Sequence, residues 1–200
     1  MPGWFTNILR ALGLSRPVAA ASTPTRRPVD DLHDAAARER TLEVVRRDRE
    51  AASVKPPPGE RVMAVARREI GVREIPGPDS NPRIIEYWRG VGTFDDETAW
   101  CSAFANWVCR EAGLEGAGKP NARSWVNWGV PVELVGIKPG DVVVFWRGSP
   151  GGWQGHVGFF AGYNGAGNLL VLGGNQGDCV SIKPYPVSRL LAVRRAVERQ

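Results

Sequence analysis

A Pro-Pro-Pro-Gly run at residues 56–59 is the feature that most constrains how this chain of 200 residues folds. Helices do not continue through consecutive prolines, because each proline lacks a backbone N–H and clashes with the preceding turn. Residues 30–52, before the run, are almost all helix formers, with acidic and basic side chains at i, i+4 spacing. We therefore expect an N-terminal extension over residues 1–59, containing a solvated helix, and a folded domain over residues 60–200.

The extension begins with apolar residues at helical spacing over residues 4–14, followed by a linker over residues 15–25 that is rich in Ala, Pro, Ser and Thr. Nothing positive precedes the apolar residues and Arg10 interrupts them, which makes a poor signal peptide. No apolar run approaches the roughly 20 residues that span a bilayer. We expect either a short amphipathic helix that contacts a membrane surface or a delivery partner, or a frayed terminal helix.

Within the domain, the apolar periodicity changes along the chain. Helical spacing is found over residues 61–70, 84–88 and 101–112, with one or two further turns over 122–128. Short apolar runs bounded by Gly and Pro then predict strands over residues 132–135, 141–146, 156–163, 169–172, 179–182 and 190–194. Helices followed by strands predict an α+β domain, whose central antiparallel β-sheet packs against the helix that begins at Cys101.

The composition limits which partners and which metal sites we expect for this chain. The net charge of +5 favours an anionic partner, but charges of both signs are interspersed, so nucleic acid, anionic lipid and anionic cell-wall polymer remain open. Three cysteines with no Cys-x-x-Cys pair argue against a disulfide framework and leave at least one thiol free. With only His33 and His156 as histidines and no zinc-ligand spacing, we expect neither metal nor cofactor.

Cys101 is the candidate nucleophile. It lies in the first turn of its expected helix, where the positive end of the helix dipole favours thiolate and lowers the pKa below the free value of about 8.5. A buried core cysteine is the alternative, because Cys101 shares an apolar stripe with Phe104 and Val108. Cys109, on the same helix, and Cys179, in a strand, are better explained by packing.

A cysteine nucleophile needs a base, and the base needs a polar partner that fixes its orientation. His156 is the domain's one histidine and follows a Gly-rich loop at the start of a strand; a surface histidine at a strand end is the alternative. The next strand ends in residues that offer Asn175, Gln176 and Asp178. We choose Asn175, since an antiparallel neighbour brings its far end towards His156, although this run is also ordinary hairpin-turn chemistry.

These motifs occur in an order that resembles the papain-like cysteine peptidases of the NlpC/P60 and CHAP superfamily. The matching segments are Trp-Cys-Ser-Ala-Phe at 100–104, Pro-Gly-Asp at 139–141, Gly-His-Val-Gly-Phe at 155–159 and Leu-Gly-Gly-Asn-Gln at 172–176. Residues 71–84 also resemble a segment of a phage- and bacteria-borne subfamily, so the resemblance runs from residue 60 to residue 195. It implies the papain-like fold and cleavage of an amide bond in bacterial peptidoglycan.

Carried over to this sequence, the resemblance implies Cys101 as nucleophile, His156 as general base and Asn175 as orienting residue, although many relatives have His, Glu or Asp in the third position. The enzyme would be a stem-peptide endopeptidase or an N-acetylmuramoyl-L-alanine amidase. It would be a monomer with peptidoglycan, not nucleic acid, as partner. It would act at the cell wall or periplasm after synthesis in the cytoplasm, as a phage-type endolysin or a secreted lysin.

Two other functions stay open on the same fold. One is a non-catalytic cell-wall-binding or structural module, and the other is a cysteine amidohydrolase or acyltransferase that acts on a protein. For substrate binding, Trp100 and Trp153 flank the nucleophile and the base, so we expect them to form walls of a groove for glycan or peptide. Loop side chains ahead of the nucleophile could contact amino groups of a stem peptide or simply be solvated, and these are Glu74, Asn81, Asp95 and Asp96.

Overall fold

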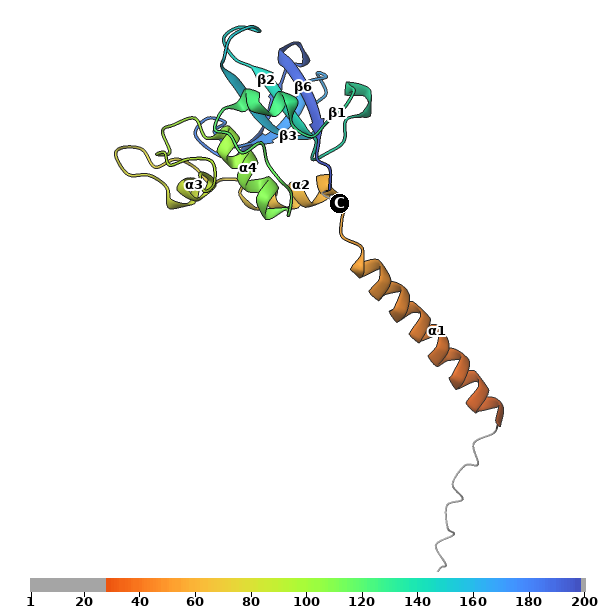
Figure 1. Cartoon of the computed structure of the whole chain (residues 1–200). Helices are drawn as coiled ribbons and strands as arrows, with labels where there is room; N and C mark the ends of the chain where they lie inside the picture. Colours follow the sequence, from red (N-terminus) through yellow and green to blue (C-terminus); the bar gives the residue numbers. More distant parts are fainter. Residues whose placement is uncertain (1–27, 199–200) are drawn as a thin grey trace, which may run out of the picture. The chain divides into compact units, whose positions relative to one another are not determined.

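The computed structural model describes residues 28–198, which belong to two compact units (Figure 1). The division falls between Val54 and Lys55, just before the proline run. The expected apolar helix at residues 4–14 and the linker at 15–25 lie outside the described residues. None of the described helices is both long enough and apolar enough to cross a membrane.

Helix α1 (Pro28–Ser53) is the element described in the first unit. Its side chains from residue 34 to residue 50 are exposed, and Asp34 pairs with Arg38 at 3.8 Å, as Glu50 does with Arg46 at 3.6 Å. Exposed pairs one turn apart contribute only about 0.3–0.5 kcal/mol each. The expected solvated helix before the proline run is confirmed.

The second unit contains three α-helices, three short 3-10 helices and six strands in the described chain. The helices are α2 (Pro58–Arg68), α3 (Pro82–Tyr87), α4 (Cys101–Glu111), η1 (Ala122–Asn127), η2 (Leu134–Gly136) and η3 (Val187–Arg189). The strands are β1 (Val130–Pro131), β2 (Val142–Trp146), β3 (Gly155–Tyr163), β4 (Leu169–Gly173), β5 (Ser181–Tyr185) and β6 (Leu190–Arg195). The proline run belongs to this unit, because Pro58 begins α2, where a missing N–H costs nothing.

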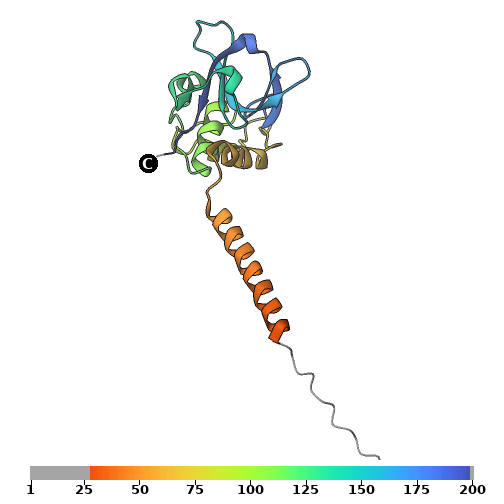
Figure 2. The same cartoon turned by 90° about the vertical axis from the view of Figure 1, so that its right-hand side faces the viewer.

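The strands form one antiparallel sheet in the order β1-β6-β2-β3-β4-β5, which confirms the α+β class. Successive side chains of β2 point to opposite faces of the sheet, as in any strand, and so pack in two separate hydrophobic clusters. Val142 and Val144 pack with the helices, whereas Val143 and Phe145 pack in a smaller cluster on the other face. Both views place α2 and α4 together on one side of the sheet (Figure 1, Figure 2).

Two expected strands differ from the structure. The segment expected as a strand at residues 132–135 instead follows the two-residue β1 and runs into η2. Val132 and Leu134 pack against the smaller core cluster, whereas Val135 is 98% exposed. The strand expected at 179–182 begins only at Ser181, because Cys179 forms an isolated bridge with Arg73.

Helix α4 is the centre of the unit because it is buried on every side. All residues from Cys101 to Cys109 are buried, including Ser102 and Asn106. A helix surrounded by protein in this way can carry polar residues only where they find partners. The Asn106 side chain donates to Ser102 O and Lys119 O and accepts from Gly118 N, which fixes the loop after α4 against the first turn of the helix.

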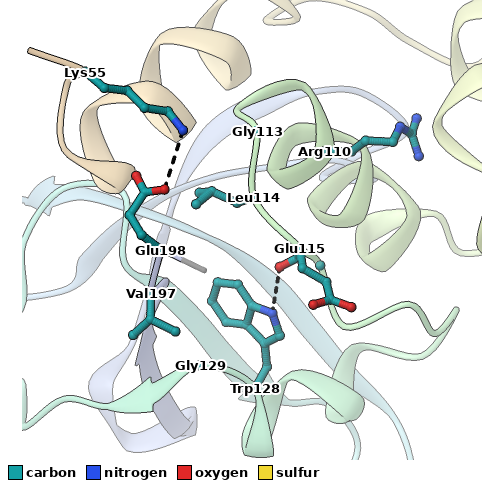
Figure 3. A pocket seen from close by; sticks show the side chains of 10 residues that line it. Lys55, Arg110, Gly113, Leu114, Glu115, Trp128, Gly129, Val197 and Glu198 are labelled. Carbon is teal, nitrogen blue, oxygen red and sulfur yellow. Dashed lines mark hydrogen bonds and ion pairs between the residues drawn. The ribbon is translucent and has the colours of Figure 1, made fainter. Parts of the chain in front are cut away.

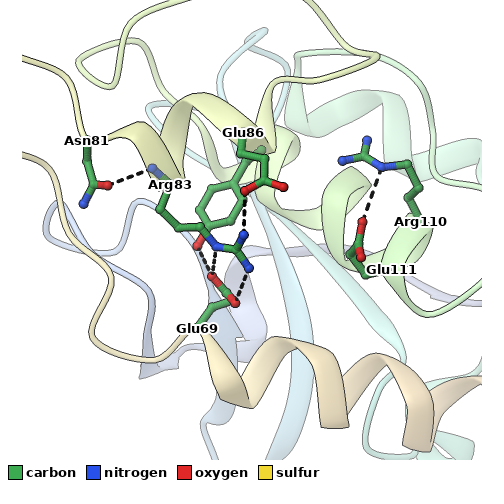
Figure 4. Close-up of polar contacts among 7 residues, drawn as sticks. Glu69, Asn81, Arg83, Glu86, Arg110 and Glu111 are labelled. Atoms are coloured by element: carbon green, nitrogen blue, oxygen red, sulfur yellow. Dashed lines mark hydrogen bonds and ion pairs between the residues drawn. The ribbon is translucent and has the colours of Figure 1, made fainter.

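An ion pair joins the helices in front of the sheet (Figure 4). Arg83 of α3 donates to both carboxylate oxygens of Glu69, at 2.8 and 2.7 Å, and to Glu86 at 2.6 Å. The Tyr87 hydroxyl donates to Glu69 at 2.6 Å, and the Arg83 guanidinium lies 4.5 Å from the Trp107 ring centre. These contacts lower the pKa of Glu69, chiefly through Arg83, and tie α3 to α2 and α4.

Candidate functional site

Cys101 begins α4 and its sulfur lies against β3. Backbone hydrogen bonds from Val157, Ser102 and Cys101 itself reach the sulfur. Donors at a helix start, together with one from a neighbouring strand, are suited to stabilise a thiolate or a developing oxyanion. The side chain is nevertheless only 5% exposed. The structure therefore gives the cysteine a polar setting inside the protein, and not at an open surface.

His156, the second residue of β3, is completely buried, and its ring has a partner at each nitrogen. Nε2 lies 3.1 Å from Gln176 Oε1, and Nδ1 lies 3.2 Å from Arg147 Nη2. The Gln176 amide is fixed because its Nε2 donates to the carbonyls of Val171 and Ser181. Its Oε1 must then accept from the ring, so the proton is on Nε2 and Nδ1 has a free lone pair.

Gln176 occupies the position that was expected for Asn175. Asn175 adopts a left-handed backbone conformation (φ 53) in the turn after β4, a conformation that asparagine tolerates better than most residues. The described contacts include none between the Asn175 side chain and His156, whereas the next side chain, Gln176, is 2% exposed and bonded to the ring. The choice of Asn175 is therefore corrected to Gln176, which the sequence had also offered.

The turn that presents Gln176 is packed directly on the helix of Cys101. A Cβ atom on Gly174 would lie 2.4 Å from the Trp100 ring and 2.7 Å from Phe104 Cβ. Only glycine fits at such a distance, since real Cβ atoms do not approach other heavy atoms that closely. The absence of a side chain at Gly174 therefore sets how near the turn comes to α4.

Burial keeps the Cys101 thiol and the His156 imidazole neutral. Removal from water raises the pKa of Cys101, and this effect outweighs the backbone N–H groups and the nearby charge of Arg147. The expected depression of the cysteine pKa by the helix dipole is therefore wrong for this arrangement. Burial, followed by the charge of Arg147, lowers the pKa of His156 to about 3. The resting site is a thiol and a neutral imidazole.

A cleft of about 500 Å³ opens beside Cys101. Its lining is mostly apolar or uncharged, and consists of Trp88, Phe94, Thr98, Ala99, Cys101, Pro120, Asn121, Ala122, Arg147, Trp153, Gln154 and Gly155. Trp153, in the loop before β3, is 81% exposed. Arg123 shapes this loop by donating to the backbone carbonyls of Ser149, Pro150 and Gln154. The cleft thus brings together the Cys101 sulfur, the Arg147 cation and the exposed aromatic face of Trp153.

Residues 93–175 match the CHAP domain family. The matched segment contains Cys101 and His156, and the NlpC/P60–CHAP resemblance is confirmed. Helices α2 and α3 precede the matched segment, and Gln176 follows it directly.

Several solved structures are similar in fold to this chain. NlpC1 from Trichomonas vaginalis has 21% identity and a TM-score of 0.48, with 73% of this chain and 47% of that chain covered. NlpC2 from the same organism has 23% identity and a TM-score of 0.48, with 72% and 49% covered. The peptidoglycan hydrolase RipB from Mycobacterium tuberculosis has 21% identity and a TM-score of 0.45, with 71% and 66% covered.

The chain therefore spans about half the length of the two Trichomonas proteins. A comparison with curated proteins found no match to this sequence.

The two tryptophans that were expected to line a groove have different positions. Trp153 lines the cleft, but Trp100 has no exposed surface and is absent from the cleft lining. Its indole N–H donates to Glu74 at 2.7 Å, and its ring packs against Tyr87 and Phe104. Trp100 is therefore corrected from a substrate-binding residue to a support for the first turn of α4.

The loop side chains ahead of Cys101 hold backbone in place. Asp96 is 1% exposed and accepts from the N–H groups of Ile75 and Asn81. Asp95 accepts from Thr98, and Asn81 caps α3 by accepting from Arg83 N. Burial raises the pKa of Glu74, which accepts from Trp100. None of these four residues is part of the cleft lining.

A second cavity, of about 690 Å³, lies at the other end of α4 (Figure 3). Figure 3 shows Lys55 paired with Glu198 at its rim and the Trp128 indole bonded to Glu115 O. It contains neither Cys101 nor His156. No group of three or more His, Cys, Asp or Glu that could hold a metal ion is found among the described residues.

Proposed function

We propose that the chain is a peptidoglycan hydrolase that cleaves an amide bond by cysteine nucleophilic catalysis. One observation carries the proposal: in the segment that matches the CHAP model, a cysteine at the start of a helix lines a cleft. The backbone of Val157 reaches its sulfur, and the residue before Val157 is a histidine whose tautomer is fixed. The residues that we assign are Cys101 as nucleophile, His156 as general base and Gln176 as the residue that orients the imidazole.

The tautomer of His156 suits this chemistry. Its proton-bearing Nε2 is held by Gln176, so Nδ1 carries the lone pair that can accept the proton of the Cys101 thiol once the contact with Arg147 is broken. The resulting thiolate attacks the scissile carbonyl carbon, and the carbonyl π electrons move to the oxygen. Backbone N–H groups at the start of α4 are positioned to stabilise that oxyanion.

Collapse of the tetrahedral intermediate breaks the C–N bond, and the leaving amine takes the proton from His156 Nδ1. A water molecule then attacks the thioester and gives one proton to the same nitrogen. The C–S bond breaks, the proton on Nδ1 returns to sulfur, and the carboxylic acid product leaves and loses its remaining proton to solvent. Gln176 adds no charge to the imidazole, so it stabilises orientation and tautomer only.

The neutral resting pair means that the nucleophile must be activated when substrate binds. Substrate in the cleft excludes water and brings the carbonyl to the sulfur, so that proton transfer and attack can proceed together. Trp153 supplies a broad exposed aromatic face at the cleft for a sugar ring or a peptide side chain. Both amide bonds of the wall, within the stem peptide and between muramic acid and L-alanine, are compatible with this cleft.

The test is mass spectrometry of soluble fragments released from purified peptidoglycan sacculi. Wild-type protein is expected to release fragments, and Cys101→Ala is expected to release none while it keeps the same thermal midpoint. Cys109→Ala is the matched control, because it removes a second thiol from the same helix and leaves the cleft intact. Fragment masses distinguish the amidase from the endopeptidase.

Other outcomes separate the alternatives. Sedimentation of both wild type and Cys101→Ala with sacculi, without any released fragment, would favour a wall-binding module. Intact sacculi together with rapid alkylation of Cys101 would favour an acyl-transfer or amidohydrolase reaction on a protein. Equal release by wild type and Cys101→Ala would show that the nucleophile assignment is wrong.

A further inference from the structure

Arg147 provides the only charge in the cleft beside Cys101. It follows β2 directly, its side chain is exposed, and among the described residues that line the cleft it is the one ionised group. An exposed guanidinium at the wall of a mostly apolar cleft can bind a carboxylate through two parallel hydrogen bonds. Within the described chain, no carboxylate lies at ion-pair distance from it.

The other arginine near the cleft has a different set of partners. Arg123 uses all three guanidinium nitrogens on carbonyl oxygens of the loop that carries Trp153, so its role is to hold backbone. Arg147 instead has Nη2 at 3.2 Å from His156 Nδ1, and it also hydrogen-bonds Tyr185. Its partners are thus a neutral imidazole and a phenol, both weaker acceptors for a guanidinium than a carboxylate.

The contact between Arg147 and His156 occupies the nitrogen that catalysis needs. Nδ1 has one lone pair, and a guanidinium has only donors, so Nδ1 cannot accept the Cys101 proton while Arg147 is bonded to it. The Tyr185 ring is stacked on the imidazole at 4.9 Å and 5°, and Gln176 holds the opposite nitrogen. The imidazole is therefore held in place from several sides, and Arg147 is the exposed partner that can leave.

We propose that Arg147 is the specificity residue of the site: it binds a carboxylate of the substrate next to the scissile amide, and in doing so releases His156 Nδ1 to accept the Cys101 proton. The proposal rests on the proposed hydrolase function for its substrate, but its geometry is independent of which wall amide is cut. A bidentate guanidinium–carboxylate pair replaces two neutral hydrogen bonds, which makes the exchange favourable. Arg147 then frees the lone pair of His156 Nδ1 in the same step in which it binds the anion.

The first experiment uses small reagents, so that it does not depend on peptidoglycan. Iodoacetate and iodoacetamide differ by a carboxylate, and each alkylates a thiol by forming a C–S bond with loss of iodide. The rate is measured by mass spectrometry on the peptide that contains Cys101. Arg147→Gln is expected to lower the iodoacetate-to-iodoacetamide rate ratio by about tenfold, whereas Arg68→Gln, an exposed arginine outside the cleft, leaves the ratio unchanged.

The second experiment uses two synthetic stem peptides that differ only in a free carboxylate or a carboxamide beside the scissile bond. Wild type is expected to prefer the carboxylate form by about tenfold in kcat/KM, and Arg147→Gln to lose that preference. Arg147→Lys, which keeps the charge without the planar fork, is expected to retain part of it. Thermal midpoints of all variants establish that they are folded.

The outcomes distinguish the two proposals. A rate ratio that changes by less than about twofold in Arg147→Gln overturns the role of Arg147, whatever happens to sacculi. Equal cleavage of the two peptides by wild type overturns it as well, with the hydrolase function intact. An Arg147-dependent ratio, with neither peptide cleaved nor sacculi digested, supports the anion site and contradicts the hydrolase.

Discussion

Two arginines show the difference between a polar network that holds the fold and one that is arranged to react. Arg83 is bonded to both oxygens of the buried Glu69, which also accepts from Tyr87 (Figure 4). Arg147 faces a neutral histidine and has no carboxylate at ion-pair distance in the described chain. The first network is complete by itself, whereas under our proposal a carboxylate of the substrate completes the second.

The comparison also explains why the two networks respond differently to charge. The Arg83 network lowers the pKa of Glu69, because the ionised carboxylate is the form that its neighbours stabilise. Around His156 the neighbours stabilise the neutral form, and its pKa falls to about 3. The structural ion pair keeps Glu69 ionised. The candidate site instead keeps Cys101 and His156 neutral, the state from which a proton can move between them.

The largest expected effect is the loss of stability when the structural network is broken. Glu69→Ala leaves Arg83 and Tyr87 without their acceptor and should lower the free energy of unfolding by about 3 kcal/mol, the low end for a broken buried pair, because Arg83 is 37% exposed. Arg147→Gln should change it by less than about 0.5 kcal/mol. Urea unfolding measures both, and equal losses would remove the distinction between the networks.

A second prediction concerns the residue that orients the imidazole. Gln176→Leu removes the acceptor of the ring N–H and should reduce kcat by about 10- to 100-fold, with a smaller change in KM, because the wrong tautomer becomes populated. Asn175→Gly, one position earlier in the left-handed turn, should keep activity within about twofold of wild type. Steady-state kinetics on a muropeptide decide between them, and the reverse pattern would restore Asn175.

A third prediction follows from the pKa of His156. Because the folded pKa is about 3 and the ordinary value is 6.5, the unfolded state binds a proton that the folded state refuses between these pH values. Stability should fall as the pH drops below 6.5, by up to about 1.4 kcal/mol per pH unit from this group. Glu69, whose pKa is lowered, adds a further loss only at the more acidic pH where carboxylates titrate.

Urea unfolding at about pH 7 and about pH 5.5 measures the first of these losses. His156→Gln removes the titrating group and should give a flatter dependence over this interval, whereas Glu69→Gln should leave it as steep as in wild type. His33 is present in all variants, so its contribution cancels. A dependence that stays equally steep in His156→Gln would contradict the neutral, buried state of the site histidine.

The smallest expected effect on stability comes from Trp153. Its ring is 81% exposed, so Trp153→Ala should change the free energy of unfolding by less than about 0.5 kcal/mol. It should nevertheless raise KM for a wall fragment, because an aromatic face of the cleft is lost. Thermal unfolding and steady-state kinetics on the same samples measure both. A large stability loss with an unchanged KM would make Trp153 a packing residue like Trp100.

Much of this site could be predicted from the sequence, because its main residues sit in strongly periodic elements. The apolar spacing of α4 located Cys101 at a helix start, and the apolar run of β3 located His156 at a strand start. What spacing does not contain is the direction of a side chain in a turn. Asn175 and Gln176 are equal candidates until the left-handed conformation at Asn175 is known.

The same reason explains the correction at Trp100 and the omission of Arg147. Proximity to Cys101 in sequence does not say whether a tryptophan points into a core or a cleft, and Trp100 is buried. For Arg147 a signal was present. Phe145 pairs with His156 across the β2–β3 hairpin, and alternate residues share a face, so Arg147 projects beside the histidine. The hairpin register was needed before that signal could be used.

Gly174 has a consequence for how this site can evolve. Because a single Cβ there would collide with Trp100 and Phe104, the turn that carries the imidazole's partner rests directly on the helix that carries the sulfur. The absence of a side-chain methyl group at Gly174 allows the turn and α4 to pack this closely. The cleft walls, where side chains face open space, can therefore change more freely than the contact between this turn and α4, which only glycine at position 174 permits.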